Sequence, residues 1–75
     1  MNSHKVLDAK GLACPMPIVK TKKAMNDLEK GQILEVHATD KGAKADLAAW
    51  TASGGHELLE TAAEGEVLKF WIQKG

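Results

Sequence analysis

The chain contains a single cysteine, and its neighbours give that thiol a distinctive setting. Cys14 stands in the stretch GLACPMPIVK, between small residues and two prolines, Pro15 and Pro17. Proline suits the first turn of a helix, because its missing N–H would have no partner there, and it disfavours α geometry in the residue before it. We therefore expect Pro15 to hold Cys14 extended in a short loop, with a helix beginning at Pro17.

A thiol at the N-terminus of a helix is expected to react as a nucleophile. The helix dipole and the free N–H groups favour an anion, which lowers the pKa of a cysteine and favours the thiolate. Three lysines follow within the predicted helix, Lys20, Lys22 and Lys23, and should add positive potential, while Gly11 leaves little bulk in the approach. The sequence thus predicts a reactive thiol that another protein can reach.

Several other kinds of cysteine chemistry are excluded by what the chain lacks. With one cysteine there is no internal disulfide, no Cys-x-x-Cys redox cycle and no multi-cysteine metal site within one chain. The histidines, His4, His37 and His56, show no spacing that pairs them with Cys14 or with a metal. We expect no metal and no organic cofactor. A lone activated thiol without a general base suits group carriage, with sulfur held as a persulfide.

Charge and hydropathy narrow the class of partner. The formal net charge is zero, but residues 1–30 carry +3 and residues 31–75 carry −3, and all ten positive side chains are lysine. A neutral domain without arginine is a poor candidate for nucleic-acid binding. The first residues lack a signal-peptide pattern and no apolar run is long enough to span a bilayer, so we expect no membrane association and a cytoplasmic location.

Hydrophobic periodicity and turn residues predict six elements that must position the thiol. The expected strands cover 5–9, 33–39, 56–63 and 66–74, and the expected helices cover 17–29 and 43–53. The order β-α-β-α-β-β predicts an α/β (α+β) two-layer sandwich, in which both helices cover one face of a four-stranded mixed sheet. The length of 75 residues predicts a single domain over 1–75.

The motif around the thiol resembles a known family, the TusA/SirA-like sulfur carriers. Their Cys-Pro-x-Pro hallmark is matched here by residues 14–17. Further matching positions are Leu7-Asp8, Gly11-Leu12, Gly31 and Gly55-His56. The resemblance implies that Cys14 takes a persulfide sulfur from a cysteine desulfurase or a rhodanese-type donor and passes it to an acceptor protein, for tRNA thiolation or related sulfur trafficking. It also implies that Pro15 and Pro17 shape the loop of the carrier residue.

Other polar residues near the motif have two readings each. Asp8 either orients the Cys14 loop by accepting backbone N–H bonds or is an exposed carboxylate at a strand end. The lysines Lys20, Lys22 and Lys23 either form a docking patch for an acidic partner surface or are a solvated helix face. The sequence alone leaves both choices open.

Two rival functions remain beside the sulfur carrier. The first is a non-catalytic interaction or regulatory module in which Cys14 is inert. The second is a redox-sensing thiol that forms a sulfenic acid or a mixed disulfide. His56 either assists sulfur transfer or is a structural histidine at a strand start, and Trp71 is expected to be partly exposed on the face of the sheet away from the helices. The sequence gives no indication of the oligomeric state.

Overall fold

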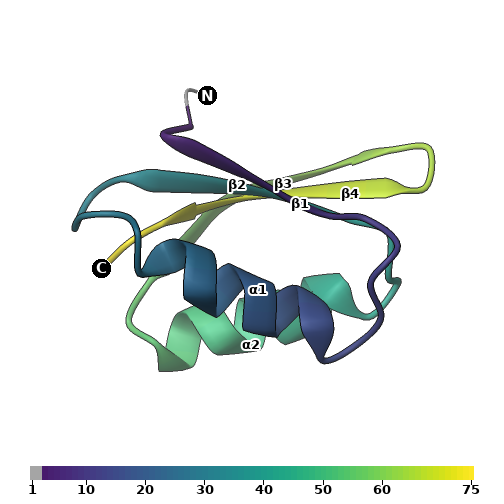
Figure 1. Ribbon diagram of the computed structural model, residues 1–75, viewed down its shortest axis with the longest axis horizontal. Helices are drawn as coiled ribbons and strands as arrows, with labels where there is room; N and C mark the ends of the chain where they lie inside the picture. Colours follow the sequence, from purple (N-terminus) through teal and green to yellow (C-terminus); the bar gives the residue numbers. More distant parts are fainter. Residues whose placement is uncertain (1–2) are drawn as a thin grey trace.

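A four-stranded sheet with two helices on one face forms the protein (Figure 1). It is described by a computed structural model that covers residues 3–75. The elements are β1 (Lys5–Ala9), α1 (Met16–Met25), β2 (Ile33–Ala38), α2 (Ala43–Ser53), β3 (Glu57–Glu64) and β4 (Val67–Gln73). The predicted element order and the two-layer sandwich are confirmed.

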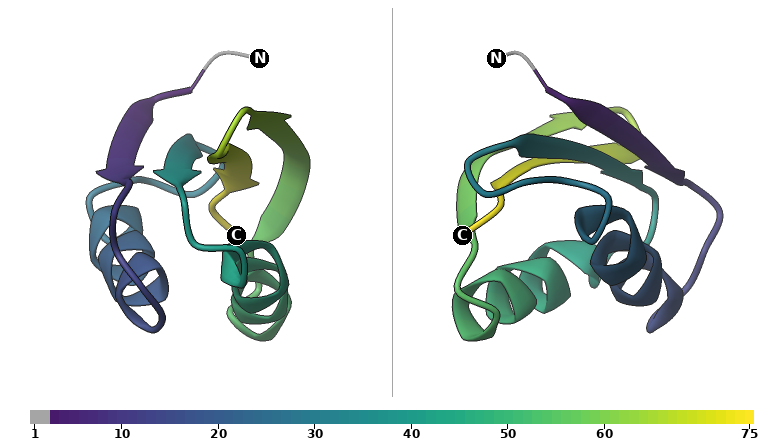
Figure 2. Two further views of the ribbon diagram at one scale, coloured as in Figure 1. Left: turned by 90° about the vertical axis from the view of Figure 1, so that its right-hand side faces the viewer. Right: turned by 60° about the vertical axis from the view of Figure 1, so that its left-hand side comes forward.

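The sheet is mixed, and its topology fixes the direction of both helices. Its strand order is β1-β2-β4-β3, with β1 parallel to β2 and both contacts of β4 antiparallel. Parallel strands need a crossover, which α1 supplies. Because β1 and β2 run the same way and each leads into a helix, α1 and α2 start at the same end of the molecule, side by side under the sheet (Figure 2).

The core lies between the sheet and the helix layer. Alternate residues of a strand face the same side, and in β2 and β4 these inward residues are apolar. The largest fully buried apolar side chains are Phe70, Met25, Leu34, Leu47, Ile72 and Val36. Burial of each such side chain is worth about 1.5–3 kcal/mol. Trp50 packs against this core from α2, as predicted.

The first helix differs from expectation at both ends. It begins at Met16, one residue before Pro17, and ends at Met25 rather than at 29. The chain tightens after Met25, because the N–H groups of Asp27 and Leu28 bond to carbonyls three residues back rather than four. Within residues 3–75 no helix has the length and apolar character needed to cross a bilayer.

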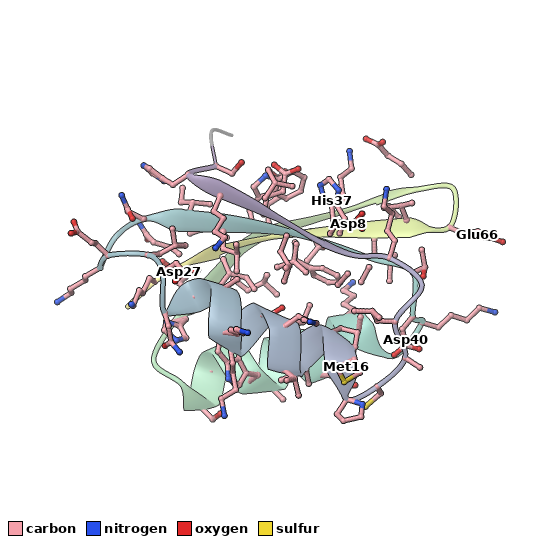
Figure 3. The ribbon with its side chains drawn as sticks, in the orientation of Figure 1. Asp8, Met16, Asp27, His37, Asp40 and Glu66 are labelled. Atoms are coloured by element: carbon pink, nitrogen blue, oxygen red, sulfur yellow. The ribbon has the colours of Figure 1, made fainter. Side chains whose placement is uncertain are left out.

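The sheet face away from the helices carries a polar network centred on Glu35. One carboxylate oxygen of Glu35 accepts hydrogen bonds from Trp71 Nε1 at 3.0 Å and Ser3 Oγ at 3.2 Å, and the other meets His37 Nε2. The hydrogen bond from His37 is the main cause that lowers the pKa of Glu35. Figure 3 shows His37 on this open face beside Asp8. Trp71 is half-buried there, in agreement with its expected partial exposure.

Candidate functional site

The loop between β1 and α1, which carries the cysteine, is anchored to both parallel strands. Gly11 has φ +81°, a left-handed conformation that glycine adopts without steric cost. Its N–H donates to Thr39 Oγ1 at 2.9 Å, just after β2. Asp8 Oδ1 accepts a hydrogen bond from the Lys10 N–H at 3.0 Å. Asp8 therefore accepts a backbone N–H bond of this loop, as the first of its two interpretations predicted. Thr39 also anchors the loop, and the sequence analysis did not identify it.

The cysteine itself sits in a tight turn immediately before α1. The Met16 N–H donates to the Ala13 carbonyl at 2.8 Å, which closes the turn around Cys14 and Pro15. The Cys14–Pro15 peptide bond is cis, and Pro15 occupies the position that caps the helix. Cys14 and Pro15 are therefore the two central residues of a turn that ends where α1 begins.

The second proline of the motif anchors the start of α1 in the core. Pro17 is buried, and its carbonyl accepts a hydrogen bond from Thr21 Oγ1 at 2.7 Å. Thr21 is itself fully buried, so its hydroxyl must bond within the protein. The Val19 N–H bonds to the Pro15 carbonyl at 3.1 Å. These contacts give the turn that carries Cys14 a fixed base.

The thiol is on the surface and has apolar neighbours that are also exposed. Cys14 is exposed, as the sequence predicted. Two large apolar side chains of the first turns of α1 remain in solvent, Met16 at 39% and Val19 at 48% exposure. Exposed apolar side chains close together are typical of a surface that another protein covers. A partner that reached the thiol would meet these side chains first.

The electrostatic environment of the thiol is opposite to the one expected. The pKa of Cys14 is raised above its ordinary value, first by a hydrogen bond to the carboxylate of Asp46, then by loss of hydration, and then by the negative charges of Asp46 and Asp40. This direction is opposite to the predicted fall in pKa, and its largest cause is the carboxylate of Asp46. Asp46 lies in the first turn of α2, which starts at the same end as α1.

The three lysines of the predicted docking patch lie on two sides of α1. Lys20 and Lys23 line a surface cleft together with Asp27, whereas Lys22 lines another with His56. At 1.5 Å per helical residue, Lys22 and Lys23 lie about 9–10 Å along the axis from Met16, the first residue of α1. Their action in docking stays a prediction, and Lys20 is the nearest of the three to the start of α1.

The histidines do not approach the thiol. His56 follows the C-terminus of α2, where its ring lies 5.0 Å from that of Trp50. That position is at the end of α2 away from Asp46, and His37 lies on the open face of the sheet (Figure 3). Among residues 3–75 no group of three histidine, cysteine or acidic side chains is placed to hold a metal ion.

The sequence and the fold are shared with sulfur carriers. Residues 5–74 match the family model described as Sulfurtransferase TusA. The chain is 80% identical, over all 75 residues of both proteins, to the putative sulfur carrier protein YrkI of Bacillus subtilis strain 168. It is 46% identical over 68 residues to the sulfur carrier protein TusA of Allochromatium vinosum, covering 91% of this chain and 90% of that one. The crystal structure of a SirA-like protein from Desulfitobacterium hafniense superposes with a TM-score of 0.83 at 26% identity, covering 95% of this chain and 97% of the other. The chain therefore belongs to the TusA sulfurtransferase family.

Proposed function

We propose that this protein carries sulfur as a persulfide on Cys14, taking it from a cysteine desulfurase or rhodanese-type donor and delivering it to an acceptor protein. The observation that carries the proposal is the exposed thiol in the matched Cys-Pro-x-Pro turn, with Met16 and Val19 exposed beside it. The names of the relatives support a sulfur carrier role. Thiolation of tRNA or a related trafficking route is the expected end of the relay, and the cytoplasmic location stays a prediction.

The two transfers need no cofactor and no net change in oxidation state. In the first, the Cys14 sulfur attacks the outer sulfur of the donor persulfide. A new S–S bond forms on Cys14, the S–S bond of the donor breaks, and the donor thiolate leaves and takes up the proton lost by Cys14. In the second, a thiolate of the acceptor attacks the outer sulfur and releases Cys14 as the leaving group. The protein supplies an accessible sulfur in a fixed turn.

A redox sensor is the alternative reading of a single exposed thiol. Peroxide reacts with the thiolate, so sensor cysteines have low pKa values as well as solvent access. Cys14 has the access, but the carboxylate of Asp46 raises its pKa. Sulfur uptake also uses the thiolate, so the sulfur-loading experiment, and not the pKa, distinguishes the two readings.

Intact-mass analysis after incubation with a cysteine desulfurase and cysteine tests the proposal. We expect the wild-type chain to gain one sulfur atom that reductant removes, and the Cys14→Ser variant to gain none. Retention of all partner-dependent function by Cys14→Ser would instead support the interaction module.

A control that moves the thiol makes this test specific. Ser53 is exposed and is the last residue of α2, at the end of the helix layer away from Cys14. The double variant Cys14→Ser with Ser53→Cys keeps one exposed cysteine in the wrong place. We expect it to gain no sulfur from the desulfurase. Equal loading of the moved thiol would show that the reaction needs only an exposed cysteine, which would contradict a built carrier site.

A further inference from the structure

One edge of the sheet is regular and has no strand beside it in the part of the chain that the structure describes. β1 is the first strand in the order β1-β2-β4-β3, so only β2 pairs with it, and their register runs without a shift from residue 5 to residue 9. At the opposite edge, the register of β3 is irregular between Leu58 and Glu60, and β3 carries three exposed glutamates. Bulges and charges protect an edge from pairing with another chain. β1 is therefore the edge that is better suited to accept a further strand.

A basic cleft lies between this edge and α1. Its volume is about 250 Å³, and its lining residues are Lys5, Leu7, Lys20, Lys23, Ala24 and Asp27. Figure 2 shows α1 beneath the β1 side of the sheet, with α2 beneath the other side. Leu7 packs against the core and Ala24 is buried, so the lining between the charged side chains is apolar. Lys20 and Lys23 are exposed and can meet a molecule bound there.

The lining of the cleft has an excess of positive charge, with three lysines against one carboxylate. Lys5 Nζ lies 2.6 Å from Asp27 Oδ2, and this ion pair accounts for one charge of each sign. Neither Lys20 nor Lys23 makes a salt bridge within residues 3–75. The acidic residue of β1, Asp8, lies on the open face of the sheet (Figure 3). The two lysines are therefore available to an anionic ligand.

We propose that the β1 edge and this cleft bind an extended segment of a partner protein in which acidic and apolar residues alternate. The segment pairs with β1 as a fifth strand of the sheet. Its side chains point alternately to the two faces. The acidic ones meet Lys20 and Lys23, and the apolar ones cover Val6, which is 55% exposed and lies beside Glu35 on the open face.

Spacing and charge favour this occupant over a second copy of the chain. Alternate residues of a strand are about 6.4–6.8 Å apart, and Lys20 and Lys23 are about 4.5 Å apart along the axis of α1. Flexible lysine side chains span that difference. Two β1 edges paired with each other would instead bring the lysines of both clefts together. The inference goes beyond the proposed carrier function, because it concerns a binding surface and not the sulfur chemistry. β1 and α1 flank the loop of Cys14, so a segment bound there holds its protein near the thiol.

Titration of the isotope-labelled protein with a short peptide tests the proposal. The probe is acetyl-Glu-Val-Glu-Val-Glu-amide, which has the five-residue length of β1, and the backbone amide signals are followed by NMR. We expect the signals of β1 to shift in the wild type and equally in Cys14→Ser. Absence of a shift in β1 at millimolar peptide would overturn the binding surface and leave the carrier function standing. If the protein bound the peptide but took up no sulfur from a desulfurase, the carrier function would fail and the surface would stand.

Charge variants test whether the cleft, and not the net charge, selects the acidic peptide. Lys20→Glu combined with Lys23→Glu replaces two exposed ion pairs with two repulsive contacts and should weaken binding roughly tenfold. Lys22→Glu combined with Lys30→Glu is the matched control, because both lysines are exposed and neither lines this cleft. Binding by the control should change by less than about twofold. Equal weakening in both double variants would overturn the role of the cleft.

Backbone methylation of the peptide tests pairing with the edge itself. Only alternate N–H groups of an added strand point toward its neighbour. We would compare a peptide that is N-methylated at its second residue with one that is N-methylated at its third. One should lose binding and the other should keep it, whereas equal behaviour of the two would overturn strand addition. Shifts in the β1 signals that appear with rising protein concentration alone would assign the edge to a second copy and overturn the proposal.

Discussion

The first turn of α2 and the last turn of α1 carry opposite charges at opposite ends of the helix layer. At the thiol end, where both helices begin, Cys14 is exposed beside the carboxylates of Asp40 and Asp46. At the lysine end, where both helices finish, Lys22 and Lys23 occupy the last turn of α1. Charges placed in this way complement the helix dipoles and stabilise each helix by about 0.3–1 kcal/mol per charge.

This difference shows that the charged residues nearest to Cys14 in the sequence are not the ones that act on its thiol. The lysines follow Cys14 by only a few residues, yet the rise of the helix carries them away from it. Asp46 follows by 32 positions (46 − 14) and faces the thiol, because two successive strand–helix units bring both helix N-termini together. The chain direction within the fold therefore decides the electrostatics of the site.

Two matched glycines offer the strongest way to test this contrast between the ends. Gly11, in the thiol loop, has φ +81°, and Gly31, near the lysine end, has φ +90°, and a Cβ on either would meet nothing within 4 Å. Alanine at either position should therefore cost about 1–2 kcal/mol from backbone strain alone. Only Gly11→Ala moves the loop of Cys14, so sulfur uptake should fall roughly tenfold in that variant and stay unchanged in Gly31→Ala.

Urea unfolding and the mass-based uptake assay measure the two effects separately. Each N–H makes one comparable hydrogen bond, from Gly11 to Thr39 Oγ1 and from Gly31 to the Lys74 carbonyl, so the pair is matched in bonding as well. Equal losses of sulfur uptake in the two variants would show that uptake follows global stability. The conformation of the thiol loop would then have no separate effect on uptake.

Most of the fold could be predicted from local pattern. Alternation of apolar residues in β2 and β4 and helical spacing in α2 gave elements within one or two residues of those observed. The C-terminus of α1 could not be predicted in this way. Leu28 is buried and continues the apolar face of the helix, although the backbone has already tightened into a turn there. Sequence periodicity reports which side chains are buried, and it does not report which hydrogen bonds hold the backbone that carries them.

For the site, the sequence predicts the exposed cysteine and misses its surroundings. Cys14, with its two prolines, was apparent from residue type and spacing. Thr39, which anchors Gly11, and Asp46, which faces the thiol, come from the next strand–helix unit and have no local signature. The strand order would have shown that both helices start at one end, and an acidic first turn of α2 would then have been a candidate neighbour.

Reversing the charge of one lysine at a time along α1 tests how the effect on sulfur uptake depends on distance from the thiol end. Lys20 is about 6 Å and Lys22 about 9 Å along the axis from Met16, where α1 begins, against a screening length of about 8 Å at physiological salt. Lys20→Glu should slow sulfur uptake roughly twofold at low salt, and Lys22→Glu should slow it less. Stopped-time mass analysis gives the rates. Equal slowing by the two variants, or none by Lys20→Glu, would argue against a docking site centred on the thiol.

A change on the open face of the sheet should have the smallest effect on sulfur uptake, because this face lies away from both ends of the helix layer. Glu35→Gln should lower stability by about 1 kcal/mol at neutral pH, since it replaces charge-assisted hydrogen bonds from His37, Trp71 and Ser3 with neutral ones. The pKa of Glu35 is lowered in the folded protein, mainly by His37. Its contribution is therefore present above the ordinary glutamate pKa of about 4.3 and is lost as the pH falls through the lowered value. Urea midpoints of the wild type and the variant should converge in that acid range while sulfur uptake at neutral pH remains equal. A gap that persists in acid would assign the loss to packing of the altered side chain, and a change in uptake would extend the site to a face that lies across the sheet from the thiol.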